Sequence, residues 1–341
     1  MTEIITIILP LILVALLGLI CAKSQWLSRQ QIEALSKFTF FVTIPAFLFY
    51  QMSHADFNQP INLGLFAAFY LPVLICYGLA WFVNNSITFE RSKLIASKRA
   101  KNELGANKLE NTSTVSSNIL AKKRHSASAL FALGASYSNT VIIGLPVLLL
   151  VIGEQVITTV FLIVTFHSAL LFLLTSVITA RSSNDIFRWQ SFVINNVKNP
   201  LILSITLGAL VNVLAIELPP SINDTLHLLG KPAITLALFV LGASLSFYTI
   251  SGKLKLLYLA TLTKLVLLPS LVWCFASIVF NLSEFTTTVL VILSASPTGV
   301  NAYLVAKNEK QQQAVVAGTV VMSTIFSIIT LPLWLSLLLN V

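Results

Sequence analysis

The sequence predicts an all-α membrane protein with ten transmembrane helices, arranged as two inverted repeats of five helices each. Three observations carry this prediction: long uncharged apolar runs, short motifs that recur between the two halves, and two apolar runs that are each broken by small polar residues, proline and glycine. Hydrophobic residues make up 56% of the 341 residues and charged residues only 10%, whereas soluble domains carry about 25% charged residues. Lipid is therefore the expected solvent for most of the chain.

The uncharged runs have the length of membrane spans, since a helix needs about 20 apolar residues to cross a bilayer. Ten runs are found, at residues 4–22, 35–53, 62–83, 127–151, 156–180, 198–216, 228–250, 255–280, 285–306 and 313–339. We number them spans 1 to 10 in chain order.

Basic residues set the expected orientation, because Lys and Arg accumulate in cytoplasmic loops. With the N-terminus outside, 20 of the 21 basic residues fall inside and only Lys231 outside. That count includes Lys264 within span 8, which is expected to snorkel to the cytoplasmic interface, or else to line a cytoplasmic vestibule. Both termini are thus expected outside. The net charge of +9 follows from this topology, so nucleic-acid binding is not implied.

Residues 84–126 form the one long polar segment, rich in Ser, Asn and Lys, which predicts a flexible cytoplasmic linker. Its basic end, 122–124, could contact anionic membrane lipid, although a solvated loop is the simpler interpretation. The three cysteines show no paired spacing, so no disulfide, metal site or cofactor is expected.

An internal repeat relates the two halves. Pro10-Leu-Ile-Leu with a Leu-Gly four residues later recurs at Pro200, an offset of 190 residues. Pro72 and Pro269 are offset by 197 residues, whereas the prolines of the two broken spans, 4 and 9, are offset by only 151 residues. The second offset is shorter by about the length of segment 84–126, which occurs only in the first half. Five spans are therefore repeated. Because five is odd, the second copy enters the membrane from the opposite side, which predicts two units, 1–180 and 181–341.

Spans 4 and 9 are each broken in the middle, at 138–146 and 294–301. A break leaves backbone N–H and C=O groups that lipid cannot satisfy, so it persists only inside protein or beside a water-filled cavity. A matched pair of breaks in two repeats indicates the binding site of a transporter.

Four motifs in order resemble the auxin efflux carrier family in its bacterial branch: Asn139-Thr140 with Gly144-Leu145-Pro146, then Lys198-Asn199-Pro200, then Leu241-Gly242-Ala243-Ser244, and Pro297-Thr298-Gly299-Val300-Asn301. The resemblance covers essentially the whole chain and implies a fold shared with bile acid symporters. Spans 1, 2, 6 and 7 would form a scaffold, and spans 3–5 and 8–10 a transport domain in which spans 4 and 9 cross. It also implies elevator-like transport of small organic anions across a bacterial cytoplasmic membrane. Plant members carry their long loop after span 5 rather than after span 3.

The broken spans suggest how an anion would bind, because half-helices that begin near the midplane present free N–H groups and a positive dipole end. Amide and hydroxyl groups of the breaks are the candidate substrate ligands: Asn139, Thr140, Ser296, Thr298 and Asn301. The alternative is that these groups only satisfy the broken backbone. Proline and glycine are expected to shape the crossing, at Gly144, Pro146, Pro297 and Gly299.

Ionisable groups inside membrane spans are functional candidates. His167 in span 5 could carry a coupled proton or could simply be hydrogen-bonded between packed helices. Lys231 could attract anions from outside or anchor span 7 at the interface. No Asp or Glu falls within any span, although backbone carbonyls at the breaks could still hold sodium.

Several alternatives stay open, among them a sodium-coupled carrier similar to the bile acid symporters and a channel. An enzyme is disfavoured, because the spans hold no metalloprotease motif, nucleophile elbow or paired carboxylates. The sequence names neither the substrate nor the direction of transport nor the coupling ion. It also leaves the oligomeric state open, a homodimer included.

Overall fold

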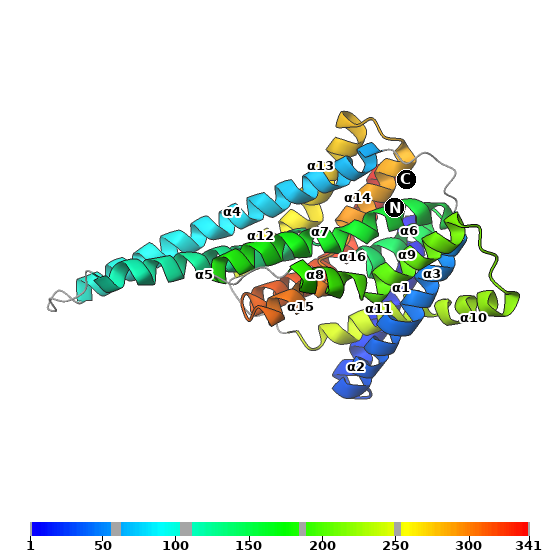
Figure 1. The fold of residues 1–341 in the computed structure, drawn as a ribbon, viewed down its shortest axis with the longest axis horizontal. Helices are drawn as coiled ribbons and strands as arrows, with labels where there is room; N and C mark the ends of the chain where they lie inside the picture. The colour runs from blue at the N-terminus through cyan, green and yellow to red at the C-terminus, as the bar shows by residue number, and fades with distance from the viewer. Residues whose placement is uncertain (1, 56–62, 103–110, 184–188, 249–253, 340–341) are drawn as a thin grey trace.

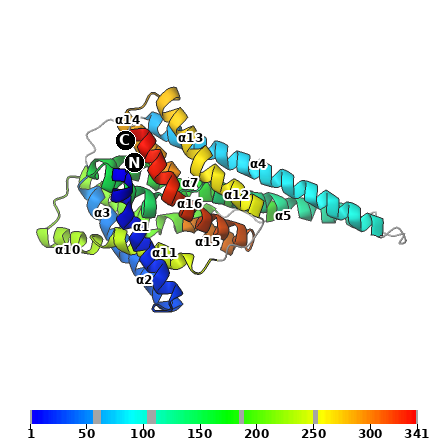
Figure 2. The ribbon, with the colours of Figure 1, turned by 180° about the vertical axis from the view of Figure 1, so that it is seen from behind.

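The computed structural model describes residues 2–55, 63–102, 111–183, 189–248 and 254–339 (Figures 1 and 2). Within these ranges the regular structure is helical: α1 (Thr2–Lys23), α2 (Arg29–Phe38), η1 (Thr39–Thr43), α3 (Ile44–Ser53), α4 (Leu63–Asn102), α5 (Asn111–Ser136), η2 (Thr140–Gly144), α6 (Leu145–Val151), η3 (Glu154–Val156), α7 (Ile157–Ser183), α8 (Trp189–Val197), α9 (Pro200–Val213), α10 (Pro220–Gly230), α11 (Ala233–Leu245), α12 (Leu254–Leu262), η4 (Thr263–Leu267), α13 (Leu268–Trp273), η5 (Cys274–Val279), α14 (Glu284–Ala295), α15 (Val300–Asn308) and α16 (Gln313–Leu339).

All ten predicted spans coincide with apolar helical segments. Seven segments among the described residues are long and apolar enough to cross a membrane, and they correspond to spans 1, 2, 3, 5, 7, 8 and 10. Spans 4, 6 and 9 contain the shorter apolar helices Thr140–Val151, Pro200–Val213 and Glu284–Ala295. Spans 4 and 9 are short because each is interrupted where the sequence predicts a break, after Ser136 and after Ala295.

Three wide turns with π-helical hydrogen bonding each stand directly before a proline. The turns η1, η2 and η4 are followed by helices whose second residue is Pro45, Pro146 or Pro269. Proline lacks an N–H and its ring clashes with the carbonyl of residue i−4, so the preceding turn must widen or kink. The widened turns of spans 2, 4 and 8 are thus a local consequence of the sequence.

The prediction of a flexible linker at 84–126 is wrong for the residues that the structure describes there. The helix α4 runs on to Asn102, and α5 begins at Asn111. The two helices lie side by side and project from the rest of the molecule (Figures 1 and 2). Extending a helix that is already nucleated in the membrane costs little, and Ala, Leu, Lys and Arg favour it.

Contacts near the base of this projection hold α4 against α5. The Asn84 side-chain amide donates to the Ser128 hydroxyl at 3.2 Å, and the Trp81 and His125 rings stack with centroids 5.4 Å apart. The guanidinium of Arg124 lies 4.6 Å from the centre of the Phe89 ring. Arg124, the last residue of the basic segment 122–124, therefore packs against α4.

The helices pack in two groups. In one group α1 packs against α11, and α3 packs against α9 and α10. In the other, α4, α5 and α7 pack in sequence, and α14 lies between α13 and α16. The start of α1 and the end of α16 lie close together at the same end of the molecule (Figures 1 and 2). The core of the second group surrounds the breaks of spans 4 and 9.

Candidate functional site

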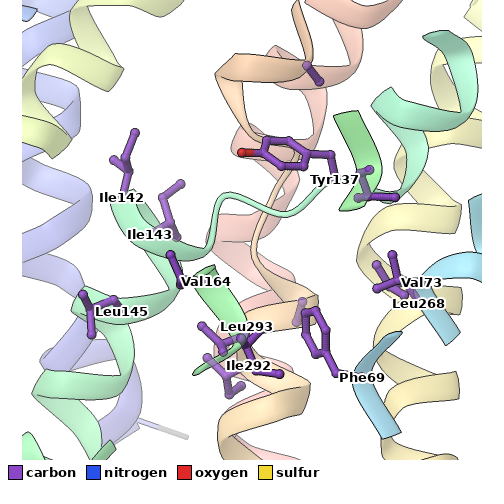
Figure 3. Close-up of a cluster of buried hydrophobic side chains, with 14 of the residues drawn as sticks. Phe69, Val73, Tyr137, Ile142, Ile143, Leu145, Val164, Leu268, Ile292 and Leu293 are labelled. Atoms are coloured by element: carbon purple, nitrogen blue, oxygen red, sulfur yellow. The ribbon is translucent and has the colours of Figure 1, made fainter. Parts of the chain in front are cut away.

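The two unwound segments cross and hydrogen-bond to each other through their backbones. Ser138 and Thr298 form an isolated antiparallel bridge. The N–H of Asn139 donates to the carbonyl of Pro297 at 2.8 Å, and the N–H of Gly299 donates to the carbonyl of Tyr137 at 3.1 Å. Figure 3 shows the segment between Tyr137 and Ile142 passing the segment that continues from Leu293. Each break therefore satisfies part of the backbone of the other.

Apolar side chains enclose this crossing. Residues of α4, α7, α13 and α14 that surround it include Phe69, Val73, Val164, Leu268 and Ile292 (Figure 3). These side chains exclude water and lipid from the two unwound segments. Polar backbone groups there must consequently be satisfied by protein groups or by a bound ligand.

Small residues are needed where the segments touch. A Cβ atom at Gly299 would lie 2.4 Å from Cε1 of Tyr137, and one at Gly144 would lie 2.8 Å from the Ser296 hydroxyl. Contacts this short are not tolerated without movement of the neighbours. Both glycines thus permit the close approach of spans 4 and 9.

Two predicted ligands of span 9 have hydroxyls that bond to backbone carbonyls. Thr298 donates from Oγ1 to the carbonyl of Gly134 at 2.8 Å, and Ser296 donates to that of Ile292 at 3.0 Å. The N–H of Thr298 donates to the Ser323 hydroxyl at 3.0 Å. Thr298 and Ser296 are fully buried. Their polar groups thus stabilise the break, as the structural alternative expects.

The other three predicted ligands line a small cavity beside the crossing. Asn139, Thr140 and Asn301 face a space of about 40 Å³. This space is large enough to hold an ordered water molecule. The side-chain nitrogen of Asn139 is buried and has no hydrogen-bond partner among the described residues. A buried donor left in this way is costly, so Asn139 is suited to bind a ligand or a water molecule.

Four polar residues of this cavity were not predicted as site residues: Tyr137, Ser138, Ser168 and Asn199. The Tyr137 hydroxyl bonds to the Ser168 hydroxyl at 2.8 Å and accepts from the Asn301 amide at 3.5 Å. Asn199 caps α9 by accepting the N–H of Leu201 at 3.0 Å. Its place before Pro200 is a helix-start signal, but only the fold reveals that this helix start faces the crossing.

His167 bonds directly to the crossing. Its Nε2 accepts the N–H of Ser138 at 3.0 Å, and its ring stacks on that of Tyr137, with centroids 5.1 Å apart and planes 7° from parallel. An imidazole nitrogen that accepts cannot carry a proton, so the proton resides on Nδ1. The Nδ1 atom is buried without a hydrogen-bond partner among the described residues. The ring is therefore neutral in this arrangement.

The snorkelling expected of Lys264 is wrong. Its side chain is fully buried, and Nζ donates to the carbonyl of Ser294 at the end of α14. The widened turn η4 places Lys264 against α14 rather than toward the cytoplasmic interface. The sequence placed Lys264 within span 8 but could not give the direction of its side chain.

A second, larger cavity of about 990 Å³ lies away from the crossing. Its walls include Tyr50 and His54 at the end of α3, Glu154 in η3, and His227 and Lys231 around the end of α10. The segments that line it all adjoin loops predicted to lie outside. Lys231 thus borders a wide vestibule rather than the site at the crossing.

Comparisons with known proteins fit this architecture. A family profile described as "Membrane transport protein" matches residues 184–335. The "Uncharacterized transporter YfdV" of Escherichia coli K12 is 21% identical over 338 residues, covering 96% of this chain and 95% of that protein. YfdV proteins of Escherichia coli O157:H7 and Shigella flexneri match equally. With seven described helices long and apolar enough to cross a membrane, the chain is a multi-pass membrane protein that is similar to membrane transport proteins over residues 184–335 and to the transporter YfdV over almost its whole length.

Proposed function

We propose that this protein is a secondary carrier of small organic anions in a bacterial cytoplasmic membrane, and that the carboxylate of the substrate binds at the crossing of spans 4 and 9. The observation that carries the proposal is the buried, unpartnered amide nitrogen of Asn139 beside the crossing. No Lys or Arg lines that cavity in the described part of the chain. An anion would therefore be held by neutral donors.

Two helix starts add to these donors. The half-helices that begin at Thr140 and Val300 follow the cap residues Asn139 and Gly299, and neither cap residue makes a side-chain hydrogen bond to its helix. Uncapped first-turn N–H groups carry partial positive charge and favour an anion. The amide of Asn301, which lies in the first turn of α15, supplies a further donor.

Elevator-like motion is supported by the fact that residues of both helix groups line this cavity. Tyr137, Asn139 and Asn301 come from spans 4 and 9, whereas Phe40 and Asn199 come from the group that contains α3 and α9. The cavity is small, about 40 Å³, so in this proposal the two groups move apart to admit a whole substrate. In this proposal spans 1, 2, 6 and 7 are the scaffold and spans 3–5 and 8–10 carry the site.

Inverted repeats, 1–180 and 181–341, would supply the two exchanged conformations. In support, α1 packs on α11 at Gly18, and α9 packs on α3 at Gly208, the glycines of the repeated Leu-Gly motif. The two halves of the crossing also correspond to each other. The N–H of Ser138 donates to a side chain of span 5, and the N–H of Thr298 donates to a side chain of span 10, the equivalent span of the second repeat. We also propose that His167 carries a coupled proton. Both termini lie in the periplasm in this proposal, and the protein contacts membrane lipid.

A ligand screen tests the proposal. Purified protein is heated in the presence of monocarboxylates, dicarboxylates and indole acids, with and without sodium. A ligand at 100 times its Kd stabilises the folded state by about 2.7 kcal/mol, which raises the Tm measurably. We expect at least one acid to raise the Tm of the wild-type protein and to do so less for Asn139→Ala. Equal stabilisation of both proteins by every active acid would place the anion elsewhere.

A further inference from the structure

Lys264 is a buried cation that the proposed anion transport does not use. It lies in the middle of span 8, within η4, and its side chain is fully buried. Ionisable groups inside a membrane protein are costly to keep and are functional candidates for that reason. A lysine whose only role was to anchor the helix would extend to the interface instead.

The surroundings of Lys264 contain no carboxylate that could neutralise it. No Asp or Glu occurs within any of the ten spans. The ionisable side chains that interact with it electrostatically are Cys76 of α4 and His167 of α7. Neither is a standing anion at neutral pH, because His167 accepts the N–H of Ser138 as a neutral ring and a thiol buried in apolar surroundings stays protonated. The partner of its amino group is a backbone carbonyl instead.

The end of α14 supplies that negative potential. Nζ of Lys264 donates to the carbonyl of Ser294, which lies in the last turn of α14, directly before the break. The last carbonyls of a helix lack N–H partners and carry partial negative charge. The same carbonyl also accepts from the Ser138 hydroxyl at 3.5 Å. One oxygen thus joins Lys264 of span 8 to both broken spans.

Broken helices of carriers commonly present unwound carbonyls and half-helix C-terminal ends to a bound sodium ion. Here an ammonium group occupies such an end. We propose that Lys264 is a built-in cation of the crossing, which holds the carbonyl end of α14 in the manner of a bound metal ion, so that spans 4 and 9 stay crossed without sodium. The proposal does not depend on which anion is carried.

The test measures thermal stability in three salts at equal ionic strength: sodium chloride, choline chloride and methylammonium chloride. The wild-type protein should have the same Tm in sodium and in choline, since its crossing already holds a cation. Lys264→Ala should lose roughly 5 °C or more in choline, because the buried carbonyl of Ser294 loses its lysine donor and keeps only the 3.5 Å bond from the Ser138 hydroxyl. Methylammonium, which reproduces the end of the lysine side chain, should restore part of that loss.

Two further variants separate charge from packing and from surface effects. Lys264→Gln keeps a hydrogen-bond donor without the charge and should be destabilised in choline as Lys264→Ala is. Lys255→Ala removes an exposed lysine from the adjoining helix α12 and should behave as wild type in all three salts.

Three results would overturn the proposal: a higher wild-type Tm in sodium than in choline, a wild-type Tm for Lys264→Gln, or no response of Lys264→Ala to methylammonium. The wild-type comparison needs no variant, so a higher Tm in sodium would overturn the proposal even if the Lys264 variants do not fold. The readout uses cations alone. If no acid raises the Tm in the anion screen, the cation test of Lys264 still stands. If the cation test overturns the role of Lys264, the proposed anion site is not affected.

Discussion

Nε2 of His167 accepts the backbone N–H of Ser138 across 3.0 Å, in the interior of the second helix group. The bond satisfies a donor that the unwinding of span 4 would otherwise leave buried and free. It also ties the protonation state of His167 to the crossing, because a proton on Nε2 would face the N–H of Ser138 and break the bond. A proton carried by His167 would thus be coupled to the geometry of the site.

Replacement of His167 should expose this dependence. His167→Phe keeps the ring stack on Tyr137 but removes the acceptor, so we expect a loss of about 1–3 kcal/mol in the free energy of unfolding from the unsatisfied N–H of Ser138. His167→Gln retains an acceptor oxygen and should lose less. Chemical denaturation of the two purified variants measures the difference. Equal stability of His167→Phe and wild type would show that the bond contributes nothing.

Asn139 is expected to act on binding rather than on folding. Its amide nitrogen has no partner among the described residues, so Asn139→Ala removes no hydrogen bond of the free protein that involves this nitrogen. We expect affinity for the acid that gives the largest Tm shift to fall by about 1–3 kcal/mol, because a charged ligand loses a donor. Isothermal titration of purified protein measures the change.

The matched control for this experiment is Asn308→Ala, an exposed asparagine at the end of the half-helix that carries Asn301. It should bind the acid as wild type does. Unchanged affinity in a well-folded Asn139→Ala protein would remove Asn139 from the set of ligands.

The sequence predicted the helices and the breaks well because both have local causes. Apolar runs of membrane length become helices wherever lipid surrounds them, and Pro146 and Pro269 widen the turns before them through their own missing N–H groups. The prediction ended span 3 too early, because a segment rich in Ser and Lys resembles a linker in composition. Such a segment can nevertheless continue a helix that is already formed, as it does in α4.

Side-chain partners at the crossing could not be predicted in the same way. Tyr137 and Ser168 meet across spans 4 and 5, and Asn199 reaches the cavity from the other helix group. Such meetings depend on how the spans are rotated and packed, which no local pattern specifies. The burial of Lys264 was missed for the same reason, since η4 turns its side chain inward.

Orientation can be tested with two single cysteines in a cysteine-free background. The distribution of basic residues predicts that residue 2 lies on the outer side of the membrane and that residue 105, which is not among the described residues, lies in the cytoplasm. An impermeant thiol reagent should label Thr2→Cys in intact cells and Gly105→Cys only after lysis. Labelling of Gly105→Cys alone in intact cells would invert the proposed topology.

A cross-link between the two helix groups should stop an elevator motion. Leu11 of α1 and Val147 of α6 line the same apolar groove, and α1 packs against α6. Leu11→Cys with Val147→Cys, cross-linked by a short bis-methanethiosulfonate that forms a disulfide with each cysteine and releases methanesulfinate, should lose transport of the acid found in the screen and regain it on reduction. The acid should still bind from one side, because Asn139 is not among the residues that line the groove.

The control joins two positions of one group. Leu11→Cys with Leu241→Cys links α1 to α11, which share the groove and pack together within the proposed scaffold. This cross-link should leave the transport rate unchanged, since no relative motion is expected there. Normal transport by the cross-linked Leu11–Val147 protein would rule out the elevator, because the site could then change its access only by gating movements within a fixed pair of helix groups.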